Sequence, residues 1–133
     1  MDKVFLDANV LFSAAYGSLG LKRLWNLSRY GDCQLLVSHY VIEEARHNLS
    51  TSEEKTRLEN YLTQVMIVPN PPWNFPCPIP LPEKDRPVFT AAVFAGATHL
   101  ITGDIRHFGE FYGKTFQGVL ILPPADYLRK YFY

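Results

Sequence analysis

Residues 3–11 read KVFLDANVL, a short run of β-prone apolar side chains that ends abruptly at an aspartate. Apolar runs of this length that stop at a polar residue are typical of buried strands. We therefore predict a strand that carries Asp7 at its carboxyl end. Asn9 follows two residues later, where it is a candidate N-cap for the next helix.

The rest of the chain alternates between strand-like and helix-like patterns. Strands are predicted over residues 33–38, 65–68, 98–102 and 118–122, and helices over residues 21–30, 39–49, 52–62, 84–97 and 124–132. Ser38 is a candidate helix cap, and Thr51 with Glu54 forms a candidate capping box. Because strands that alternate with helices build parallel sheets covered on both faces, we predict an α/β fold. Its expected form is a three-layer α/β/α sandwich with a central, mostly parallel sheet of about five strands, in a single domain over residues 1–133.

The bulk composition is that of an ordinary globular protein. Of the 133 residues, 47% are hydrophobic, and the 13 basic and 13 acidic side chains cancel. Net charge therefore does not indicate a nucleic-acid partner, and attraction to phosphate would need a local basic patch. Cys33 and Cys77 lack metal-ligand spacing and do not indicate a disulfide scaffold. Without a signal core or a run of ~20 apolar residues, we expect a soluble, cytoplasmic protein that does not enter a membrane.

A proline-rich stretch interrupts the alternation. Residues 69–82 hold seven of the ten prolines, together with Trp73 and Phe75. Proline excludes this stretch from helix interiors and central strands, so it is predicted to be an extended connector. A loop held over the core by its aromatic side chains is the favoured interpretation. A flexible linker or a polyproline ligand stays open.

Four acids are predicted to meet at one edge of the sheet. Asp7 and Asp104 follow predicted strands, Glu44 lies about two turns into a helix, and Asp85 opens the next helix. Ligands of open α/β sheets bind beyond the carboxyl ends of the strands, where these residues should gather. The pattern does not decide whether Glu44 or its neighbour Glu43 faces the site.

Such a cluster would be electrostatically costly without compensation. One like-charged pair about 4 Å apart costs on the order of 4 kcal/mol at an effective dielectric near 20. Either raised pKa values or a bound cation relieves this repulsion. Oxygen ligands suit Mg²⁺ or Mn²⁺, which support phosphodiester hydrolysis. Taken one at a time, each acid has an ordinary alternative as a turn residue, a helix cap or a solvated side chain.

Four stretches together resemble a known family. They are FLDANVLFSA (5–14), VSHYVIEEARHNL (37–49), DRPVFTAAVFAGATHLITGDIRHF (85–108) and GVLILPPADYL (118–128). In this order they resemble PIN-domain proteins, which include VapC-type toxins and related nucleases, and the resemblance runs from about residue 4 to 128. It implies a three-layer α/β/α fold and cleavage of RNA that depends on Mg²⁺ or Mn²⁺.

The resemblance also implies roles for single residues. Asp7, Glu44, Asp85 and Asp104 match the family's acids, with Asp7, Asp85 and Asp104 as the implied metal ligands. Asn9 matches the polar position that holds the first acid or a metal-bound water.

Two further residues match supporting positions of the family. Thr102 would orient Asp104, although an ordinary strand residue is an equal alternative. His107 stands where many relatives have a further acid, which puts a second metal ion in doubt. It could contact phosphate or a metal-bound water, or cap a turn.

Basic and aromatic residues offer candidate contacts to RNA. Arg46, Arg86 and Arg106 adjoin the acids in sequence and could contact phosphates, although a surface ion pair with a neighbouring acid is the favoured interpretation for each of them. The C-terminal aromatic cluster consists of Tyr127, Tyr131, Phe132 and Tyr133. It suits core packing or a homodimer face better than a platform for stacked bases.

Other functions compete with the ribonuclease. One is a non-catalytic module that binds nucleic acid or protein and retains the fold. Another is a phosphate-transfer enzyme or phospho-receiver with Asp7 as nucleophile, for which Lys114 is a poorly placed basic partner. As partners of the ribonuclease we expect RNA, an antitoxin protein if the chain is a toxin, and a second copy of the chain if it dimerises.

Overall fold

Strand β1 (Asp2–Leu6) lies in the middle of a sheet whose strand order is β3-β2-β1-β4-β6-β5. The computed structural model describes residues 1–132, except for the side chain of Phe132. The other strands are β2 (Cys33–Ser38), β3 (Met66–Val68), β4 (His99–Ile101), β5 (Thr115–Phe116) and β6 (Val119–Leu122). Every pairing is parallel except that of β5 with β6. The predicted α/β fold with a central, mostly parallel sheet is therefore confirmed, with one more strand than expected.

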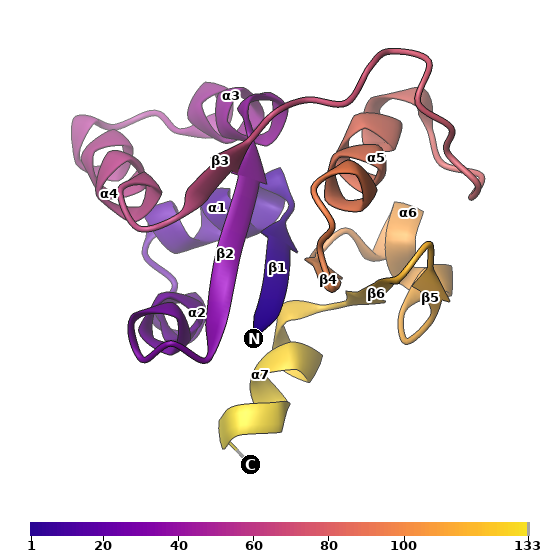
Figure 1. Cartoon of the computed structure of the whole chain (residues 1–133). Coiled ribbons are helices and arrows are strands. Elements are labelled where there is room, and N and C mark those ends of the chain that lie inside the picture. Colours follow the sequence, from indigo (N-terminus) through magenta and orange to yellow (C-terminus); the bar gives the residue numbers. More distant parts are fainter. Residues whose placement is uncertain (133) are drawn as a thin grey trace.

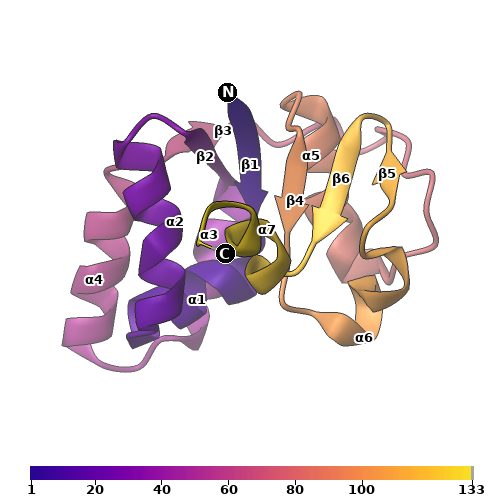
Figure 2. The ribbon, with the colours of Figure 1, turned by 90° about the horizontal axis from the view of Figure 1, so that it is seen from below.

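The helices gather in two groups beside the two halves of the sheet. They are α1 (Ala8–Tyr16), α2 (Leu19–Arg29), α3 (His39–Asn48), α4 (Ser52–Leu62), α5 (Arg86–Phe94), α6 (Ile105–Phe108) and α7 (Pro124–Phe132). Figures 1 and 2 show α1, α2 and α4 beside the half that contains β1, β2 and β3, and α5 and α6 beside the other half. No helix within residues 1–132 is long and apolar enough to cross a membrane.

Strand β1 has an apolar sequence because neighbours enclose it. Val4, Phe5 and Leu6 are fully buried; all three pair in parallel register with β4, and Val4 and Phe5 also pair with β2 on the other side. At the carboxyl end, the Asp7 backbone N–H donates to the carbonyl of Ile101 at 3.0 Å. This bond ties the end of β1 to the end of β4, so the residues after both strands are brought together.

Helix boundaries agree with the predicted caps in two cases and differ in one. The Ser38 hydroxyl accepts from the Val41 N–H, and Thr51 forms the expected capping box with Glu54. Asn9, however, is not an N-cap, because α1 already begins at Ala8 and Asp7 caps it. The Asn9 side chain is thereby free to bond across the sheet edge.

The unexpected strand β5 belongs to a tight hairpin with β6. Gln117 and Gly118 both have positive φ, at 51° and 82°, as a two-residue hairpin turn requires. Gln117 is an unusual residue for this conformation, which Asn and Gly adopt more readily. The sequence therefore carries a weak signal for this turn.

The proline-rich connector runs from β3 to α5 over one end of the molecule (Figure 1). Phe75 packs edge-to-face on Phe94 of α5 with ring centroids 5.4 Å apart, and Ile79 is buried. Trp73 contradicts the expectation that both aromatic side chains hold this loop over the core, because 95% of its surface is exposed. The connector is thus anchored through Phe75 and Ile79.

The C-terminal aromatic cluster is in part a core feature. Tyr127 is buried, donates its hydroxyl to Asp2 Oδ2 at 2.9 Å, and contacts His99 edge-to-face. Tyr131 packs beside it at a ring distance of 5.7 Å. The side chain of Phe132 and all of Tyr133 lie outside the described part of the chain, so core packing is established here for the first two tyrosines.

Candidate active site at the carboxyl edge of the sheet

All four predicted acids line one hollow of about 520 Å³ at the carboxyl edge of the sheet. Asp7 follows β1, Asp104 follows β4, Glu44 lies on α3, and Asp85 ends the short 3₁₀ turn Glu83–Asp85 before α5. Asp7 and Asp85 are buried, whereas Glu44 and Asp104 are half-buried. Residues spread over most of the chain therefore converge on one small volume.

Glu44, and not Glu43, faces this hollow. Glu44 lines it together with Asn48, one helical turn further along α3. Glu43 is exposed and bound to Arg46 at 2.7 Å. The choice that the sequence left open is thus decided by the orientation of α3.

Asp7 is held by a network that spans the ends of β1 and β4. Its Oδ1 accepts from the Ala8 N–H at 2.7 Å, and its Oδ2 accepts from the Thr102 hydroxyl at 2.8 Å and the Asn9 amide at 3.2 Å. Burial raises the pKa of Asp7 from its usual 3.8 to about 6. The hydrogen bonds from Thr102 and Ala8 oppose this rise in pKa, while the charges of Glu44 and Asp85 add to it.

Asn9 and Thr102 position the loop that carries Asp104. The Asn9 carbonyl oxygen accepts from the Gly103 N–H at 2.8 Å, and the Thr102 hydroxyl oxygen accepts from the Asp104 N–H at 3.1 Å. A Cβ on Gly103 would lie 3.3 Å from the Asn9 oxygen, so this position favours glycine. Asn9 and Thr102, two of the residues predicted to play supporting roles, therefore link the first and last acids. Thr102 also contacts Asp7 directly, which was not predicted.

His107 lies between two of the acids. Its Nδ1 is 2.9 Å from Asp104 Oδ2 and 3.0 Å from Asp85 Oδ2. The geometry of this ring nitrogen suits a hydrogen bond to Asp104, and no donor within the described residues forms one to the buried Asp85 Oδ2. Burial raises the pKa of Asp85, while the charge of His107 opposes that rise. The charges of His107 and Lys84 offset part of the cost of burying this carboxylate, and a bound cation would offset more of it.

These three residues form a group that could hold a metal ion. Asp85, Asp104 and His107 each offer one ligand atom, and the three atoms lie within 4.8 Å of one another. Two carboxylates and one imidazole suit a divalent cation such as Mn²⁺, and carboxylates with water suit Mg²⁺. Of the three predicted metal ligands, Asp85 and Asp104 belong to this group. Asp7 lines the same hollow but is engaged by Thr102.

The three predicted arginines lie in different places. Arg86 is exposed and lines a neighbouring hollow, and Arg106 is exposed on α6. Arg46 lines a separate hollow with Glu59, to which it donates at 2.9 Å. The structure therefore does not bring Arg46 to the acids.

Some residues of the site were not predicted from the sequence. Lys84 and Asn48 line the acidic hollow, and the Tyr112 hydroxyl donates to the Thr102 carbonyl at 2.7 Å. Lys84 and Asn48 could have been predicted from the sequence, because Lys84 precedes Asp85 and Asn48 lies four residues after Glu44 on the same helix face. No local pattern points to Tyr112.

Comparison with known proteins gives two findings. A family model described as PIN domain matches residues 3–106. The structure of VapBC2 from Rickettsia felis bound to a DNA fragment from their promoter contains a similar chain, with a TM-score of 0.64 and 14% sequence identity. The similarity covers 91% of the present chain and 98% of the other, and at this identity it bears on the fold alone. A search of curated proteins gave no match.

Proposed function

The chain belongs to the PIN-domain family, and from this premise we propose that it is an endoribonuclease that hydrolyses RNA phosphodiester bonds with the help of Mg²⁺ or Mn²⁺. One observation carries the proposal. The buried Asp85 Oδ2 accepts no hydrogen bond within the described residues, because the His107 Nδ1 that lies 3.0 Å from it is hydrogen-bonded to Asp104, and it lies in a hollow shared with three other carboxylates. A divalent cation would balance this concentration of negative charge.

The residues present fit such an ion. Asp85 and Asp104 would hold it, with Asp7 in the same hollow and His107 as a nitrogen ligand or as a donor to Asp104. The ion, when bound, supplies positive charge that favours ionisation of an attacking water and offsets charge on the phosphoryl oxygens.

The protein's own side chains would position the reacting groups. Thr102 and Asn9 fix the Asp7 carboxylate, and His107 fixes Asp104. Glu44 is half-buried in the same hollow, and no hydrogen bond within residues 1–132 restrains its carboxylate. We assign Glu44 the part of a proton acceptor for the attacking water, because an unrestrained carboxylate can reach a water near the other acids.

A cleavage assay on metal-free protein tests this function. The purified chain is stripped with EDTA, then incubated with RNA in the presence or absence of Mg²⁺ or Mn²⁺. We expect cleavage to require the added ion and to fall at least 100-fold in Asp104→Asn. The matched control is Asp32→Asn, which removes one exposed acid that precedes β2, at the amino edge of the sheet, and should cleave like the wild type.

Two outcomes would contradict the proposal. Full activity in EDTA would exclude a metal mechanism. Metal-independent binding of RNA without cleavage would favour the alternative, a non-catalytic nucleic-acid or protein-binding module with the PIN fold.

We further propose that the chain acts in the cytoplasm as the toxin of a toxin–antitoxin pair, with RNA as substrate, an antitoxin as protein partner and a second copy in a homodimer. The similarity to the VapBC2 assembly from Rickettsia felis supports the toxin assignment. Expression of the wild type should arrest growth, and expression of Asp104→Asn should not. Normal growth despite cleavage by the purified protein would separate the ribonuclease from a toxin role.

A further inference from the structure

Trp73 is exposed in a way that calls for an explanation. It is 95% exposed, whereas the other tryptophan, Trp25, is fully buried. A large exposed aromatic ring on an ordered segment is a common feature of binding surfaces. The ring is carried by a fixed turn, since the Phe75 N–H donates to the Pro72 carbonyl at 3.0 Å and Phe75 is anchored on Phe94. The loop therefore presents the indole to solvent instead of burying it.

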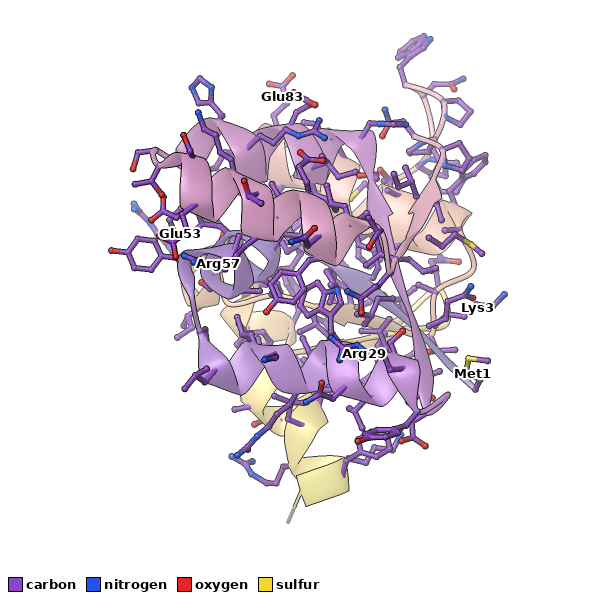
Figure 3. All side chains as sticks on the ribbon, turned by 90° about the vertical axis from the view of Figure 1, so that its left-hand side faces the viewer. Met1, Lys3, Arg29, Glu53, Arg57 and Glu83 are labelled. Atoms are coloured by element: carbon purple, nitrogen blue, oxygen red, sulfur yellow. The ribbon has the colours of Figure 1, made fainter. Side chains whose placement is uncertain are left out.

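Trp73 lines a hollow of about 740 Å³ with several prolines. Arg86 and Tyr40 line its other side. Glu83 also lines it, so the charges of Arg86 and Glu83 offset each other and do not select a phosphate. Figure 3 places Glu83 at the end of the molecule away from Met1 and Lys3. The surroundings therefore suit a flat, uncharged group such as a nucleotide base.

Another hollow lies between this one and the acidic site and shares lining residues with both. Tyr40 and Asn70 line both the Trp73 hollow and a second one of about 710 Å³. That second hollow is also lined by Glu44 and Asn48, which line the acidic hollow. The Tyr40 hydroxyl donates to the Lys84 carbonyl at 2.6 Å and so holds α3 beside the segment that carries Asp85. Three adjoining hollows therefore lie in a row from the four acids, past Tyr40, to Trp73, and we call this row the groove.

We propose that this groove binds unpaired RNA and that Trp73 stacks on a base flanking the phosphodiester at the acids. This inference rests on the proposed ribonuclease function and adds a site for one base, formed by Trp73. Bases in a duplex already stack on their neighbours and leave no free face for the indole, whereas an unpaired base does. Arg86 and Glu83 line the same hollow and offset each other's charge, so stacking on the indole, and not a phosphate contact, would provide the affinity at this end of the groove.

Tryptophan fluorescence tests the proposal directly, because the two tryptophans differ so strongly in exposure. A single-stranded oligoribonucleotide of mixed sequence is titrated into Asp104→Asn, which binds without cleaving. We expect quenching of the exposed fluorophore, and no quenching when Trp73→Phe is added to the same protein. A duplex of the same sequence should quench weakly.

Binding of the same oligonucleotide provides the second measurement. Trp73→Ala should weaken it about tenfold, as for the loss of one stacked base, and Trp73→Phe should weaken it less. Tyr30→Ala removes an aromatic ring that is 82% exposed on the end of α2 and should leave binding unchanged. Thermal unfolding should be the same for all three variants, because both rings are solvent-exposed.

The outcomes separate the groove from the catalytic function. Equal RNA affinity of Trp73→Ala and the parent protein, with no quenching, would overturn the proposal and leave the groove to a protein ligand. If the wild type cleaves RNA but RNA does not quench the fluorescence of Trp73, only the stacking site is refuted. Quenching of Trp73 by RNA without any cleavage would refute the ribonuclease and retain the RNA groove.

Discussion

The two ends of strand β1 each carry an aspartate, and the two carboxylates have opposite environments. Asp2 at the amino end accepts hydrogen bonds at its Oδ2 from Tyr127 at 2.9 Å, Lys130 at 3.1 Å and Tyr131 at 3.4 Å. Burial opposes ionisation of Asp2, but the hydrogen bonds from Tyr127 and Lys130 outweigh it, so its pKa lies below the usual value. Asp7 at the carboxyl end faces other acids, and its pKa is raised to about 6.

The partners around each carboxylate distinguish a structural acid from a candidate functional one. Asp2 joins the amino end of the sheet to helix α7, and its charge is balanced by Lys130. At the other end, four carboxylates share one hollow with a single lysine and a histidine, and Asp85 keeps a buried oxygen without a donor. A fold gains nothing from the second arrangement by itself, so the charge concentration points to a ligand.

The largest expected effect concerns the pH dependence of stability in metal-free protein. Folded Asp7 keeps its proton up to about pH 6, whereas in the unfolded chain it releases it near 3.8. The folded state therefore binds more protons in this window, and stability falls as pH rises from about 4 to 6. The full difference corresponds to about 3 kcal/mol. Asp7→Asn should flatten this part of the profile, measured by urea unfolding in EDTA.

Asp32→Asn is the matched control for this measurement, because Asp32 is exposed. Its profile should fall with pH like that of the wild type. An Asp7→Asn profile with the same slope as the wild type would show that repulsion at the carboxyl edge does not act through Asp7.

At the amino end we expect the opposite sign and a smaller effect. Asp2→Ala leaves the buried Tyr127 hydroxyl without its acceptor and removes the partner of Lys130, which should cost about 2 kcal/mol of unfolding free energy near neutral pH. Because the pKa of Asp2 is depressed on folding, its contribution is present above pH 4 and is lost on acidification. At pH 7 the variant should be less stable than the wild type, and the difference in unfolding free energy should narrow as the pH is lowered below 4.

Activity provides the second half of this test. Asp2 is remote from the acidic hollow, so Asp2→Ala should cleave RNA at the wild-type rate below its melting temperature. A selective loss of cleavage with unchanged stability would mean that the two ends of β1 do not have separate roles.

The sequence predicted much of the carboxyl edge because strand ends are local features. Asp7 and Asp104 follow apolar runs that are readable without any tertiary information. The parallel arrangement then brings these ends to one edge, as it does for β1 and β4. Glu44 needed the orientation of α3, which the neighbouring Glu43 left ambiguous.

Other features depend on contacts between distant residues and could not be read locally. Asn9 was predicted as a helix cap, but it bonds to residues at the end of β4, more than 90 positions away. The ion-pair network of Asp2 likewise depends on α7, 128 positions along the chain in the case of Lys130. Trp73 was expected to help hold the connector, because its sequence gives no way to distinguish an anchoring ring from a presented one.

The smallest expected effect on stability is that of replacing Arg46, whose charge is balanced by surface ion pairs away from both ends of β1. Its guanidinium donates to Glu59 at 2.9 Å and to Glu43 at 2.7 Å, but 42% of its side chain is exposed. Solvent and salt screen such pairs, so Arg46→Ala should lower the unfolding free energy by less than about 1 kcal/mol. In a Glu59→Gln background, Arg46→Ala should lower the unfolding free energy by less than it does in the wild type. This difference between the two backgrounds should shrink in 1 M salt, because the salt screens the charges.

RNA cleavage decides between this structural role and the phosphate contact that the sequence suggested. Arg46 lines a hollow with Glu59 and Lys55, apart from the acids, so Arg46→Ala should retain wild-type cleavage and wild-type RNA affinity. A tenfold loss of affinity at unchanged stability would place RNA over α3 and α4, and would extend the binding surface beyond the groove that leads to Trp73.

Figure 3 shows the neighbouring pair of Glu53 and Arg57 on α4, an i,i+4 pair at 2.9 Å. Arg57→Ala is not a neutral control, because Arg57 also donates to the Ala15 carbonyl at 2.7 Å; a larger loss of stability there than in Arg46→Ala is expected for that reason.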